Sequence, residues 1–135
     1  MASLFHPDAI DDHGVYNGSA AGYVDWIRAM DIPGYHWMHH NGTRIIEIDG
    51  DVAFAETYCL AFYRQSEEGK EGEKEMFLRV RYLDRVEKRN GDWRIAHRRV
   101  VYSPSQIVKV AEEFPFDDEV TLMEGGYPKD EAYKW

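Results

Sequence analysis

The stretch EMFLRVRYLDRVEKRNGDWRIAHRRVVY, residues 75–102, decides the fold. It contains two strand-like runs, 75–89 and 93–102, separated by Asn90-Gly91. This dipeptide is a strong signal for a two-residue hairpin, because asparagine and glycine both accept the positive φ angles that such a turn needs. The stretch therefore predicts two long antiparallel strands joined by a tight turn.

Two further runs precede this hairpin. Residues 37–48 and 52–65 are strand-like and are joined by Asp49-Gly50-Asp51, a second tight-turn signal. The charged, glycine-containing segment 66–74 predicts a mobile hairpin loop. Because long antiparallel strands twist, we expect residues 51–102 to form a strongly curved sheet around one hydrophobic pocket.

The N-terminal part predicts one strand and one helix. Residues 9–16 are strand-like, Asn17-Gly18 is a turn signal, and Ser19 is a suitable cap for a helix over 20–30. Its apolar residues recur at helical spacing: Tyr23, Val24, Trp26, Ile27 and Met30. The predicted fold class is α+β, a cone-shaped antiparallel sheet packed on this helix and enclosing the pocket.

The pattern weakens after the fourth run, which Ser103-Pro104 is expected to end. Residues 106–114 predict a short helix, and the acidic remainder, 115–135, is expected to lie on the surface or against a neighbouring subunit. We therefore divide the chain into a conical domain, 1–104, and a C-terminal extension, 105–135.

Composition excludes several classes of function. The chain has 135 residues, which fits one domain, and a formal net charge of −9 argues against nucleic acid and weakly against anionic membranes. Cys59 is the single cysteine, no apolar run is long enough to cross a bilayer, and the N-terminus does not resemble a signal peptide. We expect a cytoplasmic protein without a disulfide. Phosphate-loop, serine-hydrolase and paired-cysteine motifs are absent, and no cofactor is expected.

An ordered series of short motifs resembles a known family. The motifs are FHPDAIDDHG (5–14), HHNGT (39–43), IDGDVA (48–53), RYLDR (81–85), NGDWRI (90–95) and HRRVV (97–101). Together they resemble the SnoaL-like branch of the nuclear transport factor 2-like superfamily. The resemblance covers about residues 4–103, and residues 124–133 also look like that branch.

The resemblance implies a conical α+β barrel with a deep pocket. Relatives include polyketide cyclases, scytalone dehydratase, hexachlorocyclohexane dehydrochlorinase, ketosteroid isomerase and the small subunits of ring-hydroxylating dioxygenases. Most act on hydrophobic small molecules without a cofactor, and several use a histidine with an aspartate. Such proteins usually begin with a long helix that often carries the aspartate, whereas this sequence starts almost at the first strand. The start is either truncated or native.

The resemblance assigns the catalytic histidine to His40. An imidazole takes and returns a proton near neutral pH, which suits elimination or isomerisation. His39 is adjacent and must point to the opposite face of a strand, and the resemblance favours His40 as the one that faces the pocket. A histidine that only bonds with a backbone carbonyl is the alternative.

Asp11 and His13 are spaced so that a strand places both side chains on one face, with Asp12 on the other. They form either a hydrogen-bonded base, two ligands of a metal, or a polar cap before Gly14. The metal interpretation is weak, because His40 is the one obvious third ligand. The resemblance places Asp11 at a pocket-lining position, where it can substitute for the missing carboxylate.

Arg98 matches a pocket arginine of the dehydrochlorinase-like relatives, which can stabilise a developing anion. The alternative is an ion pair with Asp84 or Glu56 on a neighbouring strand. Whether Arg98 or Arg99 points inward depends on whether a β-bulge shifts the register.

Three aromatic residues are candidates for substrate contact. Tyr58 and Tyr82 are either pocket hydroxyls or core residues, and Trp26 is either a substrate contact or a packing residue. Cys59 lies mid-strand without a basic neighbour and is interpreted as packing.

Two functions remain open at this point. The first is a cofactor-independent lyase or isomerase for a hydrophobic ring compound. It would use His40 as base, Asp11 or His13 to orient it, and Arg98 or a tyrosine to stabilise an oxyanion. The second is a non-catalytic ligand-binding or structural subunit, like the small subunit of a ring-hydroxylating dioxygenase. In either case we expect a hydrophobic small-molecule ligand and a homo-oligomer, a dimer or trimer, because a sheet without its covering helix exposes apolar surface.

Overall fold

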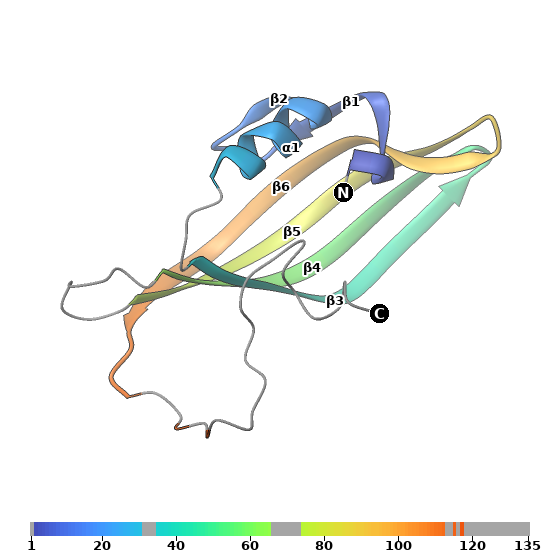
Figure 1. The fold of residues 1–135 in the computed structure, drawn as a ribbon. Coiled ribbons are helices and arrows are strands. Elements are labelled where there is room, and N and C mark those ends of the chain that lie inside the picture. The colour runs from blue at the N-terminus through green and yellow to red at the C-terminus, as the bar shows by residue number, and fades with distance from the viewer. Residues whose placement is uncertain (1, 31–34, 66–73, 113–114, 116, 118–135) are drawn as a thin grey trace.

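The computed structural model describes residues 2–30, 35–65, 74–112, 115 and 117 (Figure 1). Its elements are a 3₁₀ turn η1 (Ala2–Leu4), β1 (Phe5–Asp12), β2 (Asn17–Ser19), α1 (Ala20–Ala29), β3 (Tyr35–Asp49), β4 (Val52–Gln65), β5 (Lys74–Arg89) and β6 (Asp92–Lys109). The strands form a single sheet in the order β2-β1-β6-β5-β4-β3.

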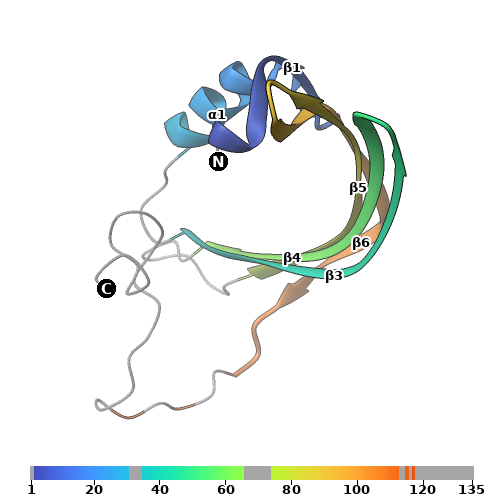
Figure 2. The ribbon, with the colours of Figure 1, turned by 90° about the vertical axis from the view of Figure 1, so that its right-hand side faces the viewer.

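The sheet is strongly curved, and α1 lies at one end of its concave side (Figure 2). Strands β3 to β6 pair antiparallel in succession, whereas β1 runs parallel to β6. The sheet is therefore mixed rather than wholly antiparallel. The prediction of an α+β fold with a curved sheet packed on a helix is confirmed.

Both predicted hairpin turns are present. Asn90 and Gly91 have φ angles of 54° and 91°, which is the left-handed pair that a two-residue hairpin requires. Gly50 has a φ of 59° between β3 and β4. These turns fix the register of the strands that they join, so each hairpin begins in alignment.

The alignment changes at three places along the β3–β4 and β5–β6 pairs. The register shifts between Asn41 and Arg44 in β3, between Phe77 and Arg79 in β5, and between Arg85 and Val86 in β5. A one-residue shift moves all the following side chains of a strand to the other face of the sheet. These irregularities therefore decide which side chains reach the concave side.

The N-terminal strand differs from its prediction. It covers Phe5–Asp12 rather than 9–16, and Asn17-Gly18 belongs to β2 rather than to a turn. The chain turns instead at residues 13–16, where the His13 amide donates to the Tyr16 carbonyl at 2.7 Å and Gly14 has a φ of 75°. This turn brings β2 back alongside β1.

Ser19 caps α1 as predicted, because its Oγ accepts the Gly22 amide hydrogen at 3.1 Å. We expect the substitution Ser19→Ala to lower the free energy of unfolding by about 1 kcal/mol, since an orphaned amide at the first turn loses its acceptor. Urea denaturation followed by circular dichroism measures the change. The matched variant Ser19→Asp keeps an acceptor, so a loss as large as that of Ser19→Ala would contradict a capping role.

Strand β6 continues past Ser103-Pro104 to Lys109, so the predicted strand end at 103–104 is wrong. The helix predicted over 106–114 is also wrong where the structure describes it, because Gln106 pairs with Phe77 in the sheet. Pro104 lies where the register shifts between β5 and β6, and a proline is tolerated at such a bulge because its missing amide breaks no ladder bond. The predicted extension 105–135 thus starts inside β6. Residues 113–114, 116 and 118–135 lie outside the described part.

The core lies on the concave side of the sheet in two clusters. One consists of Cys59, Ala61, Val80, Tyr82 and Val100, and the other of Phe5, Ala9 and Ala20. The first cluster contains mostly small side chains from the three central strands. Tyr82 and Val100 therefore mark the face on which α1 and the β1–β2 turn are seated.

Candidate functional site

A buried carboxylate and an imidazole lie together at the end of β1. Asp11 is wholly buried, at 0% exposure, and its Oδ1 accepts a hydrogen bond from His13 Nδ1. The two residues meet because alternate strand positions share a face. Asp11 Oδ2 has no hydrogen-bond partner among the described residues. The predicted Asp11–His13 pair is therefore present as a hydrogen-bonded pair.

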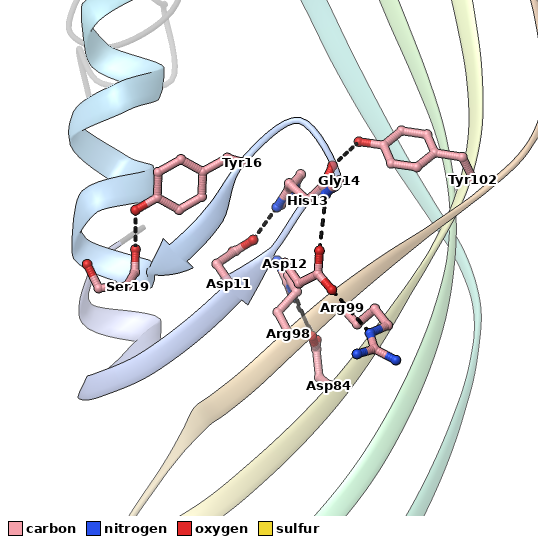
Figure 3. Close-up of polar contacts among 10 residues, drawn as sticks. All are labelled: Asp11, Asp12, His13, Gly14, Tyr16, Ser19, Asp84, Arg98, Arg99 and Tyr102. Atoms are coloured by element: carbon pink, nitrogen blue, oxygen red, sulfur yellow. Dashed lines mark hydrogen bonds and ion pairs between the residues drawn. The ribbon is translucent and has the colours of Figure 1, made fainter.

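Three further contacts hold the turn after this pair (Figure 3). Asp12 accepts the Gly14 amide through Oδ1 and Arg99 Nε through Oδ2, both at 3.3 Å. The Tyr102 hydroxyl donates to the His13 carbonyl at 3.1 Å. These contacts hold the backbone of His13 in place without using its side chain.

The His13 ring is packed among aromatic residues of α1 and the sheet. It stacks on Tyr23 with centroids 4.0 Å apart and an interplanar angle of 17°, and Tyr82 lies 6.5 Å away. Tyr16 and Trp26 extend the group around Tyr23. About one-eighth of the His13 side chain, 13%, stays exposed. The ring is thus held in one orientation and stays partly exposed.

Trp26 lies at the edge of this aromatic group, with its ring 5.9 Å from that of Tyr23. Burial raises the pKa of the Tyr23 hydroxyl, and the negative charge of Asp11 adds to the effect. Tyr23 therefore keeps its proton at neutral pH and acts as a neutral hydrogen-bonding group.

Arg98 points inward, whereas Arg99 points to the other face. Arg98 binds Asp84 through Nε and Nη2 at 2.7 Å each, and its guanidinium lies 4.5 Å from the centroid of Tyr82. Burial alone would lower the pKa of Arg98, but the hydrogen bonds and charge of Asp84, with smaller contributions from Tyr82 and Asp11, raise it. Of the two predicted roles, the ion pair with Asp84 is the one that is formed.

The prediction that His40 faces the concave side is wrong. His40 pairs with Leu60, whose side chain is largely exposed, whereas His39 pairs with Ala61 of the core. The cause is the register shift between Asn41 and Arg44. Arg44 pairs with Thr57 on the concave face, so regular alternation back along β3 would turn His40 to the concave side. The extra residue between Asn41 and Arg44 turns His39 to that side instead. The hypothesis in which His40 is the base fails with this orientation.

His39 instead bonds with Tyr63 on the concave side. His39 Nε2 and the Tyr63 hydroxyl lie 2.7 Å apart, and the ring of Trp37 is 5.6 Å from that of His39. Burial lowers the pKa of His39, and the charge of a protonated His13 lowers it further. His39 therefore favours the neutral imidazole at neutral pH.

Tyr58 does not line the concave side, which corrects its assignment as a pocket residue. It pairs with Arg81, lies under the Arg81 guanidinium at 5.9 Å, and has an exposed ring. Tyr82 does lie inward, and its hydroxyl is 3.7 Å from Cys59 Sγ. Burial raises the pKa of the Cys59 thiol, which fits a packing role.

Sequence reasoning assigned no inward role to three residues on the concave side: Tyr23, His39 and Tyr63. A signal existed for Tyr63, because alternation from Cys59 through Ala61 leads to it along β4. The signal for His39 is hidden by the register shift. The described residues contain no group of three or more histidine, cysteine, aspartate or glutamate side chains placed to bind a metal ion.

The curved sheet, the one helix of the described part and the order of the sequence motifs are those expected of a SnoaL-like domain, and a comparison with protein-family models finds the same family. The model of the SnoaL-like domain matches residues 1–99. The chain belongs to the SnoaL-like domain family. No curated protein matches the chain.

Several solved structures share this SnoaL-like fold. A putative scytalone dehydratase from Novosphingobium aromaticivorans is 18% identical, with a TM-score of 0.64 and coverage of 90% of this chain and 79% of the other. LinA is 18% identical, with a TM-score of 0.69 and coverage of 86% and 78%. A putative aromatic ring hydroxylase from N. aromaticivorans is 16% identical, with a TM-score of 0.65 and coverage of 78% and 75%. At these identities the likeness concerns the fold. No helix in the described part of the chain is long and apolar enough to cross a bilayer.

Proposed function

We propose that this SnoaL-like domain is a cofactor-independent lyase or isomerase that removes a proton from a hydrophobic ring compound. The observation that carries the proposal is the Asp11–His13 pair, in which a buried carboxylate holds an imidazole on the concave side. A carboxylate in this position fixes the imidazole tautomer and stabilises the imidazolium that forms when the ring takes a proton.

His13 is the general base in this proposal. Because Nδ1 donates to Asp11, the lone pair of the neutral ring is on Nε2, which has no hydrogen-bond partner among the described residues. Nε2 takes a proton from a carbon next to an electron-withdrawing group, and the C–H electron pair forms a new double bond. Either a leaving group then departs with its electrons, or the proton returns at another carbon.

The surroundings of His13 suit an apolar ring as substrate. Tyr23, Tyr82 and Trp26 provide aromatic surface, and Tyr23 and Tyr82 carry hydroxyls that stay protonated. Arg98 is engaged with Asp84, and its positive charge still acts on this region at short range. It favours negative charge that develops on a substrate oxygen.

The alternative hypothesis is a non-catalytic ligand-binding or structural subunit. It predicts that polar side chains do not converge on the concave side. The inward placement of Asp11, His13, Arg98 and His39 supports the lyase or isomerase instead. Homo-oligomerisation and a cytoplasmic location stay predictions. The exposed apolar side chains Met38, Phe54, Tyr58 and Leu60 suit an oligomer formed through the convex face.

The test uses ring ketones and β-hydroxy ketones in deuterium oxide, with mass increase and enone absorbance as readouts. We expect catalysed exchange or elimination with at least one compound, and Asp11→Asn should lower that rate about a hundredfold. The amide still accepts from Nδ1 but carries no charge to stabilise the imidazolium. Asp12→Asn is the matched control on the opposite face, and it should keep nearly full activity. Equal effects of the two substitutions, or no catalysis with any compound, would contradict the proposal.

A further inference from the structure

A second polar pair lies on the concave side at the other edge of the sheet. His39 belongs to β3, the edge strand, and bonds with Tyr63 of β4 at 2.7 Å. The Asp11–His13 pair belongs to the end of β1, near the opposite edge. The concave side therefore carries one hydrogen-bonded pair toward each edge.

The curvature of the sheet brings the two pairs across from each other. Strands β6, β5 and β4 separate β1 from β3, so a flat sheet would hold them roughly 19 Å apart at about 4.8 Å per strand. The sheet bends round to form one concave side (Figure 2), and the Asp11–His13 pair and the His39–Tyr63 pair both lie on that side. The pairs thus face a shared space.

Small apolar side chains of the central strands lie between the two pairs. Cys59, Ala61, Val80 and Val100 are buried in the central strands, and all four have small side chains. Tyr82 and Tyr23 add aromatic surface near His13. A flat apolar ring can pack against these small side chains, with the larger side chains of Tyr82, Tyr63 and Leu78 beside it.

We propose that the concave side binds a ring compound with a hydrogen-bonding oxygen at each of two opposite ends, one bound by the Asp11–His13 pair and one by the His39–Tyr63 pair. This inference rests on the proposed function and names the chemical class of its ligand. The His39–Tyr63 pair is then a specificity-determining group that anchors the end of the ligand away from the reacting carbon.

The chemistry of His39 suits a ligand hydroxyl. If Tyr63 donates to Nε2, the neutral ring carries its hydrogen on Nδ1 and donates to the ligand. If Nε2 donates to Tyr63, Nδ1 accepts from the ligand. His39 Nδ1 has no hydrogen-bond partner in the part of the chain that the structure describes. A hydroxyl both donates and accepts, so it satisfies either arrangement.

The experiment measures equilibrium binding of matched aromatic probes by quenching of intrinsic fluorescence. The probes come in three sizes, and each size has one compound with a single hydroxyl and one with a second hydroxyl at the opposite end. They are phenol and hydroquinone, 2-naphthol and 2,6-dihydroxynaphthalene, and 4-hydroxybiphenyl and 4,4′-dihydroxybiphenyl. In the pair whose length fits, the second hydroxyl should tighten binding about tenfold, the upper end for one buried hydrogen bond.

The variant His39→Phe should abolish this advantage, so that the one-hydroxyl and two-hydroxyl probes of the fitting length bind with equal affinity. His40→Phe, the adjacent histidine on the convex face, is the control and should keep the advantage. A second hydroxyl that adds nothing in all three pairs, or an advantage that survives in His39→Phe, overturns this inference alone. Failure of every probe to bind also overturns this inference, whereas the proposed function is overturned only by the exchange and elimination test.

Discussion

The substitution Arg98→Met is expected to lower the free energy of unfolding by about 3–5 kcal/mol. Asp84 is 8% exposed and receives two hydrogen bonds from Arg98 at 2.7 Å. Removing the guanidinium leaves a charged carboxylate buried beside Tyr82, where water cannot replace both bonds. This loss reports the free-energy cost of leaving the Asp84 carboxylate buried without a partner, and not the net contribution of the ion pair to stability.

Arg99→Met is the matched control, since it removes the same charge from the next residue. Arg99 is 61% exposed and its contact with Asp12 is an exposed ion pair, so the expected loss is below about 1 kcal/mol. Urea denaturation followed by circular dichroism compares the two variants. The double variant Arg98→Met/Asp84→Leu should recover much of the stability, because it removes the stranded charge. Equal losses for Arg98→Met and Arg99→Met would show that the Asp84 contact is not buried in solution.

The parts of the molecule that sequence predicted well depend on local rules. Asn90-Gly91 and Gly50 form the turns because few other residues accept positive φ angles. Ser19 caps α1 because its hydroxyl reaches an amide three residues ahead. Asp11 and His13 share a face because they are two residues apart in a strand. None of these features depends on the register of a distant strand.

The wrong orientation of His40 and the open choice between Arg98 and Arg99 both depend on register shifts. The shift between Asn41 and Arg44 turns His39 inward and His40 outward. The shift between Arg85 and Val86 places Arg98 opposite Asp84, and without it Arg98 would point to the convex face. A bulge inserts one extra residue, and the amino-acid sequence does not reveal its position. Alternation counted from one end of the strand therefore assigns a residue to one face, and alternation counted from the other end assigns it to the opposite face. Which side chains face the concave side can therefore be assigned only from the pairing of each strand with its neighbours.

The second large effect is expected for His13→Gln, which should lower kcat/KM by about a thousandfold on the ring compound that the exchange test identifies. Glutamine keeps a polar side chain at the end of β1 but cannot take a proton at neutral pH. The loss should fall on kcat, because the aromatic surface that binds the ring, Tyr23 and Tyr82, is unchanged. Steady-state kinetics together with fluorescence binding separate the two quantities.

His97→Gln is the control for this change, since His97 pairs with Arg85 on the other face of the sheet and lies in the same β6 strand as Arg98. Its kcat/KM should stay within about twofold of the unsubstituted protein, which is the range of surface substitutions. If His13→Gln raised KM and left kcat intact, His13 would be a binding group and the base would lie elsewhere. A loss of kcat with unchanged binding would assign the proton transfer to the Asp11–His13 pair, and the buried carboxylate of Asp11 would then explain why the imidazole that follows β1 acts as a base.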